Sequence, residues 1–391
     1  MTQAGGEGSE ARTVATLLSL LTLGLVDNQL LAPILPDIAA SLAVEETSVG
    51  RTVSAYAIAA AVAALVVGPM SDRVGRGRFL VLSGVVFGFG SVLVVAAESI
   101  WVFVAARIVT GAAAGVISAL TVAAIADLVP YERRGRVMGW VAVAYFAAPI
   151  LGVPFAAFVA DRVGWRVNYI VFALSAGSAA AFVARWFREP DVHHAHPARP
   201  FGYLRFFRAR STAAGALSAF FVTGGLTGFL LFLGAYLRST FGLSLTEVGL
   251  VFLLSGIASL FGALLAGRLS DRVGKLRVAL AGSAGLAIFF LIVPATSGVA
   301  LYATLACVGL SAAARVAPLQ SIVTQVVSRE SRGAYVALRN TLSQGGSATA
   351  AAIASEIYER GFQYICWMTA GFSAVAFVLI LFIDEPGDAK E

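Results

Sequence analysis

The chain contains Gly68-Pro69-Met70-Ser71-Asp72-Arg73-Val74-Gly75-Arg76, which returns in altered form as Gly267-Arg268-Leu269-Ser270-Asp271-Arg272-Val273-Gly274-Lys275. The two stretches lie 199 residues apart in a chain of 391 residues. A second pattern is repeated at an offset of 198 residues: Glu132, Arg134 and Gly135 match Glu330, Arg332 and Gly333. Two independent echoes at nearly one spacing predict a duplicated unit that fills about half of the chain.

The composition around these stretches indicates a protein that lies in a lipid bilayer. Apolar residues make up 59% of the chain and charged residues only 13%. A soluble domain carries about 25% charged residues, which it needs to cover its surface. Apolar runs of about 20 residues, the length that crosses a bilayer as a helix, alternate here with short polar segments. The sequence therefore predicts an all-α membrane protein.

Twelve such runs are present, which predicts six helices in each copy of the duplicated unit. The expected helices are 13–40, 48–70, 78–97, 100–128, 135–160, 166–187, 211–240, 246–268, 276–296, 298–327, 333–357 and 361–383. The only long polar stretch inside the chain is 188–210, which carries Pro190, Pro197 and Pro200. We therefore expect an N-terminal six-helix bundle at 1–187, a cytoplasmic linker at 188–210 and a C-terminal six-helix bundle at 211–391.

The basic residues give the orientation of the chain in the membrane. If the N-terminus is cytoplasmic, most of the 28 Arg and Lys residues fall in cytoplasmic segments, and few fall in outer ones. Arg329, Arg332 and Arg339 are assigned to the cytoplasmic segment that follows the tenth helix. Because cytoplasmic loops are enriched in Arg and Lys, we expect a multi-pass protein with both termini in the cytoplasm.

The motifs resemble those of the major facilitator superfamily over essentially the whole chain. The stretch from Gly68 to Val81 looks like the signature loop between helices 2 and 3 of that family, and its copy after helix 8 is also typical. Arg107 and Gly111, followed by Asp127 and Pro130, resemble a second family motif on helix 4. The resemblance implies two six-helix bundles related by a pseudo-two-fold axis. It also implies a transporter that works by alternating access, carries a small molecule and acts as a monomer.

Within the superfamily, the chain looks most like bacterial proton-coupled drug exporters with twelve helices. Those proteins carry a Gly- and Pro-rich motif in helix 5, and the matching stretch here is Ala148-Pro149-Ile150-Leu151-Gly152-Val153-Pro154, with Ala148 and Val153 in place of two glycines. The resemblance implies antiport of protons against a small amphipathic or lipophilic compound across the bacterial inner membrane. The stretch Asp27-Asn28-Gln29-Leu30-Leu31-Ala32-Pro33 faintly resembles Spinster-type lysolipid transporters instead. A proton symporter for an organic anion, bound by Arg315, is a further alternative.

Charged residues at bilayer depth are the first candidates for a mechanism, because each costs about 2.5–3.5 kcal/mol to insert. Asp27, Arg107, Arg315 and Glu356 lie inside expected helices. Asp27 and Arg107 come at similar depths on helices 1 and 4, which both line the central cavity in the family fold, so the two could pair. We expect Asp27, Arg107 and Glu356 to take part in proton coupling, and Arg107 and Arg315 to contact substrate.

Other polar positions are assigned to the pocket and to a gate. Polar and aromatic residues expected at mid-depth predict a mostly apolar pocket with a few polar points: Asn28, Tyr56, Tyr145, Gln320, Thr324 and Gln344. In the family, the signature-loop carboxylate meets a helix N-terminus, where the helix dipole favours negative charge. The residues that the resemblance assigns to this gate are Gly68, Asp72, Arg73, Gly75, Arg76, Asp127 and Asp271.

Other functional classes find little support in the chain. A membrane enzyme would need histidines or acids clustered at one depth, but His193, His194 and His196 all lie in the expected linker. The basic residues are spread over short loops, which is not the pattern of a nucleic-acid-binding surface. No phosphate-binding or metalloprotease motif is present, so we expect neither a cofactor nor a metal.

Overall fold

The computed structural model describes residues 3–128, 137, 140–141, 143–144, 148–187, 202–327 and 331–384. Every regular element among these residues is helical. The chain divides into two compact units, unit 1 at Met1–Pro197 and unit 2 at Ala198–Glu391.

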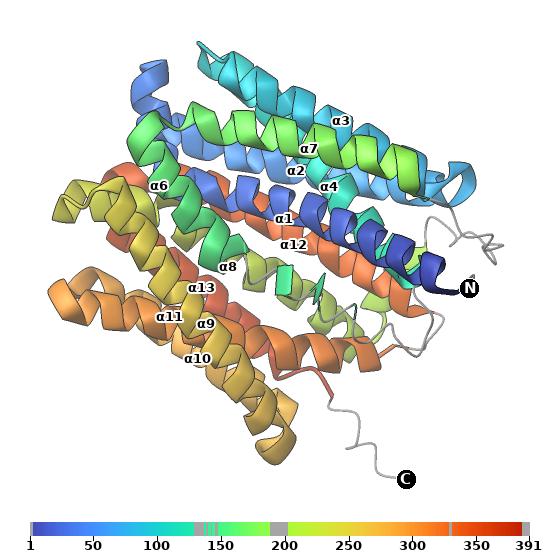
Figure 1. Ribbon diagram of the computed structural model, residues 1–391. Helices are drawn as coiled ribbons and strands as arrows, with labels where there is room; N and C mark the ends of the chain where they lie inside the picture. Colours follow the sequence, from blue (N-terminus) through green and yellow to red (C-terminus); the bar gives the residue numbers. More distant parts are fainter. Residues whose placement is uncertain are drawn as a thin grey trace, which may run out of the picture. The chain divides into compact units, whose positions relative to one another are not determined.

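Unit 1 is a bundle of long helices. Its elements are α1 (Gln3–Leu42), α2 (Glu46–Val74), α3 (Arg76–Val95), α4 (Ile100–Leu128), the π-helical turn η1 (Ala148–Gly152), α6 (Val153–Val163) and α7 (Arg166–Trp186). Helix α2 packs along α4, and α3 packs along α7 (Figure 1). Helix α1 contacts α4, α7 and η1, so that its middle turns are enclosed by other helices of the unit.

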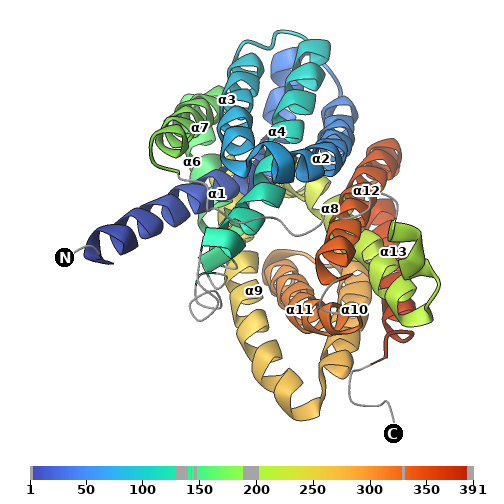
Figure 2. The ribbon, with the colours of Figure 1, turned by 90° about the vertical axis from the view of Figure 1, so that its right-hand side faces the viewer.

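Unit 2 repeats this plan. Its elements are η2 (Gly202–Phe207), α8 (Arg210–Phe241), α9 (Leu245–Val273), α10 (Lys275–Ile292), η3 (Val293–Ala295), α11 (Gly298–Gln325), α12 (Arg332–Ile357), η5 (Tyr358–Arg360) and α13 (Phe362–Ile380). Helix α9 packs along α11 as α2 does along α4, and α10 packs along both α11 and α13 (Figure 2). Helix α8 packs most extensively on α12.

Ten helices among the described residues are long and apolar enough to cross a membrane. The other two of the expected twelve correspond to η1 with α6, and to the more polar α12. A helix suits this environment because its backbone N–H and C=O groups bond within the segment, where lipid offers no partner. The prediction of an all-α, twelve-helix membrane fold is therefore confirmed.

The two signature stretches adopt the same conformation, as a duplication requires. Gly75 has φ 111° and donates its N–H to the carbonyl of Ser71, and Gly274 has φ 99° and donates to the carbonyl of Ser270. This backbone conformation is accessible to glycine and disfavoured for other residues. A glycine at this position thus ends α2 and starts α3, and in the second copy it ends α9 and starts α10.

Several helix ends differ from the expected ones, among them the start of α1 and the ends of α2 and α9. Helix α1 begins at Gln3 rather than at residue 13, because hydropathy locates the part of a helix that suits lipid and not the end of the helix itself. The Ser-Asp-Arg motif was expected in a loop, but α2 continues to Val74 and α9 to Val273. The backbone leaves the helical conformation only at the glycine that follows each motif.

Small residues on α4 bring it close to α2. A Cβ atom added at Gly111 would lie 2.5 Å from the carbonyl oxygen of Tyr56, and one added at Gly115 would collide with the backbone of Ala60. Membrane helices use such small residues to let backbones approach. The consequence is that Arg107, one turn before Gly111, is held directly against Tyr56.

Candidate functional site

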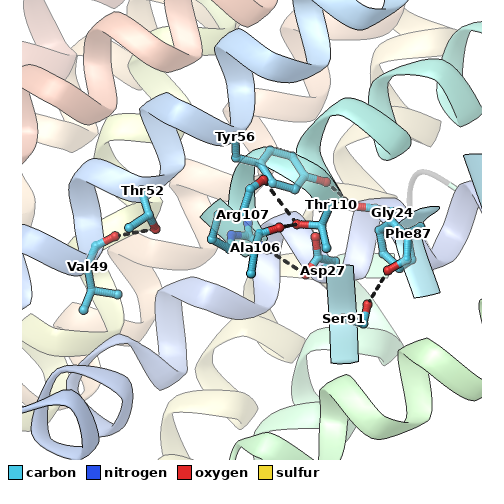
Figure 3. A network of polar contacts seen from close by, with 10 residues as sticks. All are labelled: Gly24, Asp27, Val49, Thr52, Tyr56, Phe87, Ser91, Ala106, Arg107 and Thr110. Carbon is cyan, nitrogen blue, oxygen red and sulfur yellow. Dashed lines mark hydrogen bonds and ion pairs between the residues drawn. The ribbon is translucent and has the colours of Figure 1, made fainter. Parts of the chain in front are cut away.

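An ion pair lies at the centre of unit 1. Arg107 of α4 donates from Nη1 to Oδ1 of Asp27 on α1, at 2.7 Å (Figure 3). Both side chains are 0% exposed. The sequence-based expectation that these two residues pair is therefore confirmed, whereas their role in proton coupling stays a prediction.

Tyr56 of α2 completes the group from a third helix. The Cζ atom of Arg107 lies 4.2 Å from the centre of the Tyr56 ring, which is cation–π geometry. The Tyr56 hydroxyl donates to the carbonyl of Gly24 on α1, over a long 3.4 Å (Figure 3). Tyr56 is buried beside the ion pair and contacts α1 and α4. Its expected role in a substrate pocket stays a prediction.

The hydrogen bonding of the pair is incomplete. Asp27 Oδ2 and the Nε and Nη2 atoms of Arg107 have no hydrogen-bond partner among the described residues. The hydroxyl of Tyr169 on α7 is likewise buried without a partner, and it lies within electrostatic range of both charges. Sequence analysis missed Tyr169, because a tyrosine in an apolar helix has no pattern that separates it from ordinary packing.

The surroundings of Asp27 act on a proton at its carboxyl group in two opposing ways. Burial penalises the carboxylate anion, whereas the guanidinium of Arg107 stabilises it, so the two effects oppose each other. The balance changes whenever the distance between Asp27 and Arg107 changes. The uncommitted Oδ2 offers a place for the proton, and the free donors of Arg107 need another acceptor once the pair opens.

The π-helical turn η1 lies against α1 next to this group. A Cβ atom added at Gly152 would collide with the side chain of Val26, the neighbour of Asp27 in sequence. Single π-turns inside helices are frequent at functional sites. Gly152 is the glycine that the helix 5 motif retains, and its contact with Val26 places that motif against the part of α1 that carries Asp27.

Unit 2 contains a buried arginine of a different kind. Arg315 of α11 is 1% exposed and donates from Nη2 to the carbonyl of Val222 on α8, at 3.0 Å. Its Nε and Nη1 atoms have no hydrogen-bond partner in the part of the chain that the structure describes. No carboxylate among those residues pairs with it. Arg315 was expected to contact substrate, and that role stays a prediction.

A third buried arginine corrects the loop assignment made from the sequence. Arg339 was counted with the cytoplasmic segment, but it lies on α12 and is 8% exposed. It donates from Nε to the carbonyl of Gly215 on α8 at 3.0 Å, and from Nη1 to Oε1 of Gln320 on α11 at 2.8 Å. The sequence could have indicated this burial, because Arg339 lies inside the expected helix 333–357. Gln320, which accepts this bond, is an exposed residue. Its expected role in the pocket stays a prediction.

The remaining predicted residues are not brought together by the described contacts. Asn28 and Gln344 are half-buried, on α1 and α12, and Glu356 is exposed near the end of α12. Gly68 lies in α2, Gly75 and Arg76 lie at the start of α3, and Asp271 is exposed near the end of α9. Tyr145 lies outside the described residues. So do the side chains of Asp72, Arg73, Asp127 and Thr324.

Comparison with known proteins gives a family. The model of the Major Facilitator Superfamily matches residues 17–233 and again 215–391. The uncharacterized MFS-type transporter YwfA of Bacillus subtilis is 26% identical over 379 residues, covering 94% of this chain and 92% of that protein. The multidrug resistance protein D of Escherichia coli is 26% identical over 264 residues, covering 66% of each chain.

The fold is also found among solved structures. The inward-open xylose transporter XylE from Escherichia coli aligns with a TM-score of 0.76 at 17% identity, covering 97% of each chain. At this identity the likeness shows a shared fold and says nothing of the substrate.

Proposed function

The chain belongs to the major facilitator superfamily, a family of membrane transporters and not of enzymes, and from that premise we propose that it is a proton-coupled antiporter. It exports a small amphipathic or lipophilic compound by alternating access. The multidrug resistance protein among its relatives supports this choice of substrate class. The antiporter acts as a monomer in the bacterial inner membrane with both termini in the cytoplasm, an orientation that the distribution of Arg and Lys supports.

The buried pair of Asp27 and Arg107 carries this proposal. In the deprotonated state the carboxylate holds Arg107 and ties α1 to α4. A proton from the outer side binds Asp27, neutralises it and weakens this tie, so that the helices rearrange and the site faces the cytoplasm. The proton then leaves to the cytoplasm, and Arg107 pairs again with the carboxylate as substrate is bound for export.

The groups that face Asp27 decide how it responds to pH. Arg107 faces it from α4, Tyr56 from α2 and Tyr169 from α7. Arg107 carries the full charge among these and therefore dominates the coupling. The two phenols offer hydrogen-bond partners to Arg107 and to the protonated carboxyl when the ion pair opens.

The signature stretch supplies the cytoplasmic gate in this proposal. Asp72, Arg73, Gly75 and Arg76, with Asp127, hold the cytoplasmic ends of the helices together in one state, and Asp271 does the same in the second copy. The support is the shared backbone geometry of Gly75 and Gly274, which places both motifs at equivalent helix ends.

A thermal-shift screen of the purified protein tests the proposal. The panel holds lipophilic drugs, lysolipids, sugars and organic acids, each tested at about pH 5.5 and about pH 7.5. A ligand at 100 times its Kd stabilises the protein by about 2.7 kcal/mol, which is readily measured. We expect amphipathic compounds to stabilise the wild type in a pH-dependent manner.

Two variants decide whether the pH dependence comes from the pair. In Asp27→Asn, which keeps an oxygen within reach of Arg107, binding should become independent of pH. The matched control Asp161→Asn makes the same chemical change at an exposed position on α6 and should behave as the wild type. Stabilisation by sugars alone, or a pH dependence unchanged in Asp27→Asn, would contradict the proposal.

A further inference from the structure

Three arginines are buried among the described residues, and Arg315 differs from the other two in its hydrogen-bond partners. Arg107 has the carboxylate of Asp27, and Arg339 has a backbone carbonyl and a side-chain amide oxygen. Arg315 has one backbone carbonyl, that of Val222, and leaves Nε and Nη1 without a partner. Helices α8 and α10 pack around it: α8 supplies the carbonyl of Val222, and a Cβ added at Gly282 of α10 would lie 2.7 Å from the backbone nitrogen of Arg315.

Such a cation is costly for a membrane protein to keep. Guanidinium remains charged in proteins and presents five N–H donors. A buried charge without a counter-ion is strongly unfavourable, and charged residues inside membrane segments mark binding sites and transport pathways. The described residues provide no carboxylate for Arg315, and Nε and Nη1 are left as donors for an acceptor from outside this set.

A second unsatisfied polar group faces the same turn of α8. The buried hydroxyl of Ser373 on α13 has no hydrogen-bond partner among the described residues, and its oxygen would lie 3.6 Å from a Cβ added at Gly225. Val222, which accepts from Arg315, lies one turn before Gly225. The two buried side chains of unit 2 with unsatisfied donors, among those described, thus flank one stretch, Val222 to Gly225.

Aromatic side chains adjoin this stretch. The rings of Phe220 and Phe221 on α8 lie 5.1 Å apart, and the ring of Phe372 on α13 lies 5.4 Å from that of Phe221 and 6.3 Å from that of Phe220. Phe221 precedes Val222 in sequence, and Phe372 precedes Ser373. The aromatic group therefore lies on α8 and α13, the helices that carry Val222 and Ser373, and Arg315 reaches Val222 from α11.

We propose that Arg315 and Ser373 bind the acidic headgroup of an amphipathic molecule, with the aromatic group of Phe220, Phe221 and Phe372 contacting its apolar part. The headgroup is a carboxylate or a phosphate, because guanidinium matches both in bidentate geometry. This inference rests on the proposed function and names its substrate class as amphipathic anions. Since Arg315 is 1% exposed, the ligand reaches it when the helices around it part, as they do in an alternating-access cycle.

The test compares probes that differ only in the headgroup. Octanoate, octyl phosphate and 1-octanol are titrated against the purified protein in neutral detergent, and Kd is obtained from thermal shifts. A hydrogen bond to a charged group contributes enough to expect an affinity about 10- to 100-fold higher for the two anions than for the alcohol. Equal affinities for the anions and the alcohol would overturn the inference.

Variants assign any preference to Arg315. Arg315→Met should abolish the preference for anions while raising the midpoint of thermal unfolding, since it removes an unpaired buried charge. Arg315→Lys should retain part of the preference. Arg339→Met, a buried arginine with its partners in place, should lower the unfolding midpoint and keep the preference. A preference for anions that survives in a folded Arg315→Met protein would refute the proposal.

Two further arms separate the sources of the headgroup and the two proposals. Octanoate binding is measured in nanodiscs that contain anionic phosphatidylglycerol and in nanodiscs of phosphatidylcholine alone. Weaker binding in the presence of phosphatidylglycerol shows competition and assigns the acidic headgroup to bilayer lipid. Absence of competition assigns it to a free amphiphile. Asp27→Asn should lose pH dependence yet keep the preference for anions. A chain that binds anions and alcohol alike, but whose pH dependence still requires Asp27, contradicts this inference and leaves the proposed function standing.

Discussion

At the scale of single residues, the three buried arginines show that burial alone does not define a role. Among the described residues, Arg107 is neutralised by a carboxylate, Arg339 is held by two oxygens, and Arg315 has one backbone carbonyl and no carboxylate. The first arrangement suits proton exchange, the second suits structural support, and the third suits a ligand with a negative charge. The difference lies in the partners that neighbouring helices present.

The ion pair makes a prediction about stability at this scale. Removing one partner leaves the other charge buried alone, which costs about 3–5 kcal/mol, whereas replacing both by apolar residues is often neutral. We expect Asp27→Leu and Arg107→Met each to lower the free energy of unfolding by that amount. The double variant should lose far less than the sum. Unfolding in sodium dodecyl sulfate measures all three, and additive losses would contradict the assigned pairing.

At the scale of elements, the close approach of α2 and α4 positions the site. Gly111 allows the contact between the two helices. Because Arg107 lies one turn away on the same helix, this contact also sets the position of Arg107. The turn η1 packs on α1 through the contact between Gly152 and Val26. Helix packing therefore positions the part of α1 that carries Asp27, in addition to the ion pair itself.

The glycine contact predicts a large difference between two similar substitutions. Gly111→Val places side-chain atoms where the backbone of Tyr56 lies, and overpacking of this kind costs about 1–3 kcal/mol. It should also move Arg107 from Asp27 and weaken the pH dependence of ligand binding. Gly177→Val on α7 is the matched control, because a Cβ there has nothing within 4 Å. Both are measured by thermal unfolding and by the pH dependence of ligand binding; equal effects of the two would show that the α2–α4 contact is unimportant.

At the scale of the whole molecule, apolar runs and the repeat predicted most of the fold. A helix in lipid must be long and apolar, so its presence can be read from the sequence. Its ends cannot, because the backbone of α1 stays helical through the polar residues from Gln3 onward. The pairing of Asp27 with Arg107 followed from depth and from the family resemblance.

The parts of the site that escaped prediction depend on tertiary contacts. Arg339 was placed in a loop because a basic residue near a helix end is usually cytoplasmic. Its burial depends on the carbonyl of Gly215, which is far away in sequence. Tyr169 and Ser373 stand out only because their hydroxyls lack partners, a property that exists only once the helices are packed.

The central claim is that Asp27 exchanges a proton in step with the binding of substrate. Proton release on ligand addition measures this directly, in lightly buffered solution with a pH indicator, using an amphipathic ligand identified by thermal shift. The account predicts release of about one proton per bound ligand near the pH at which Asp27 is half protonated. Asp161→Asn should release the same amount and Asp27→Asn none. Binding without proton release in the wild type at any pH, or equal release in Asp27→Asn, would contradict the account.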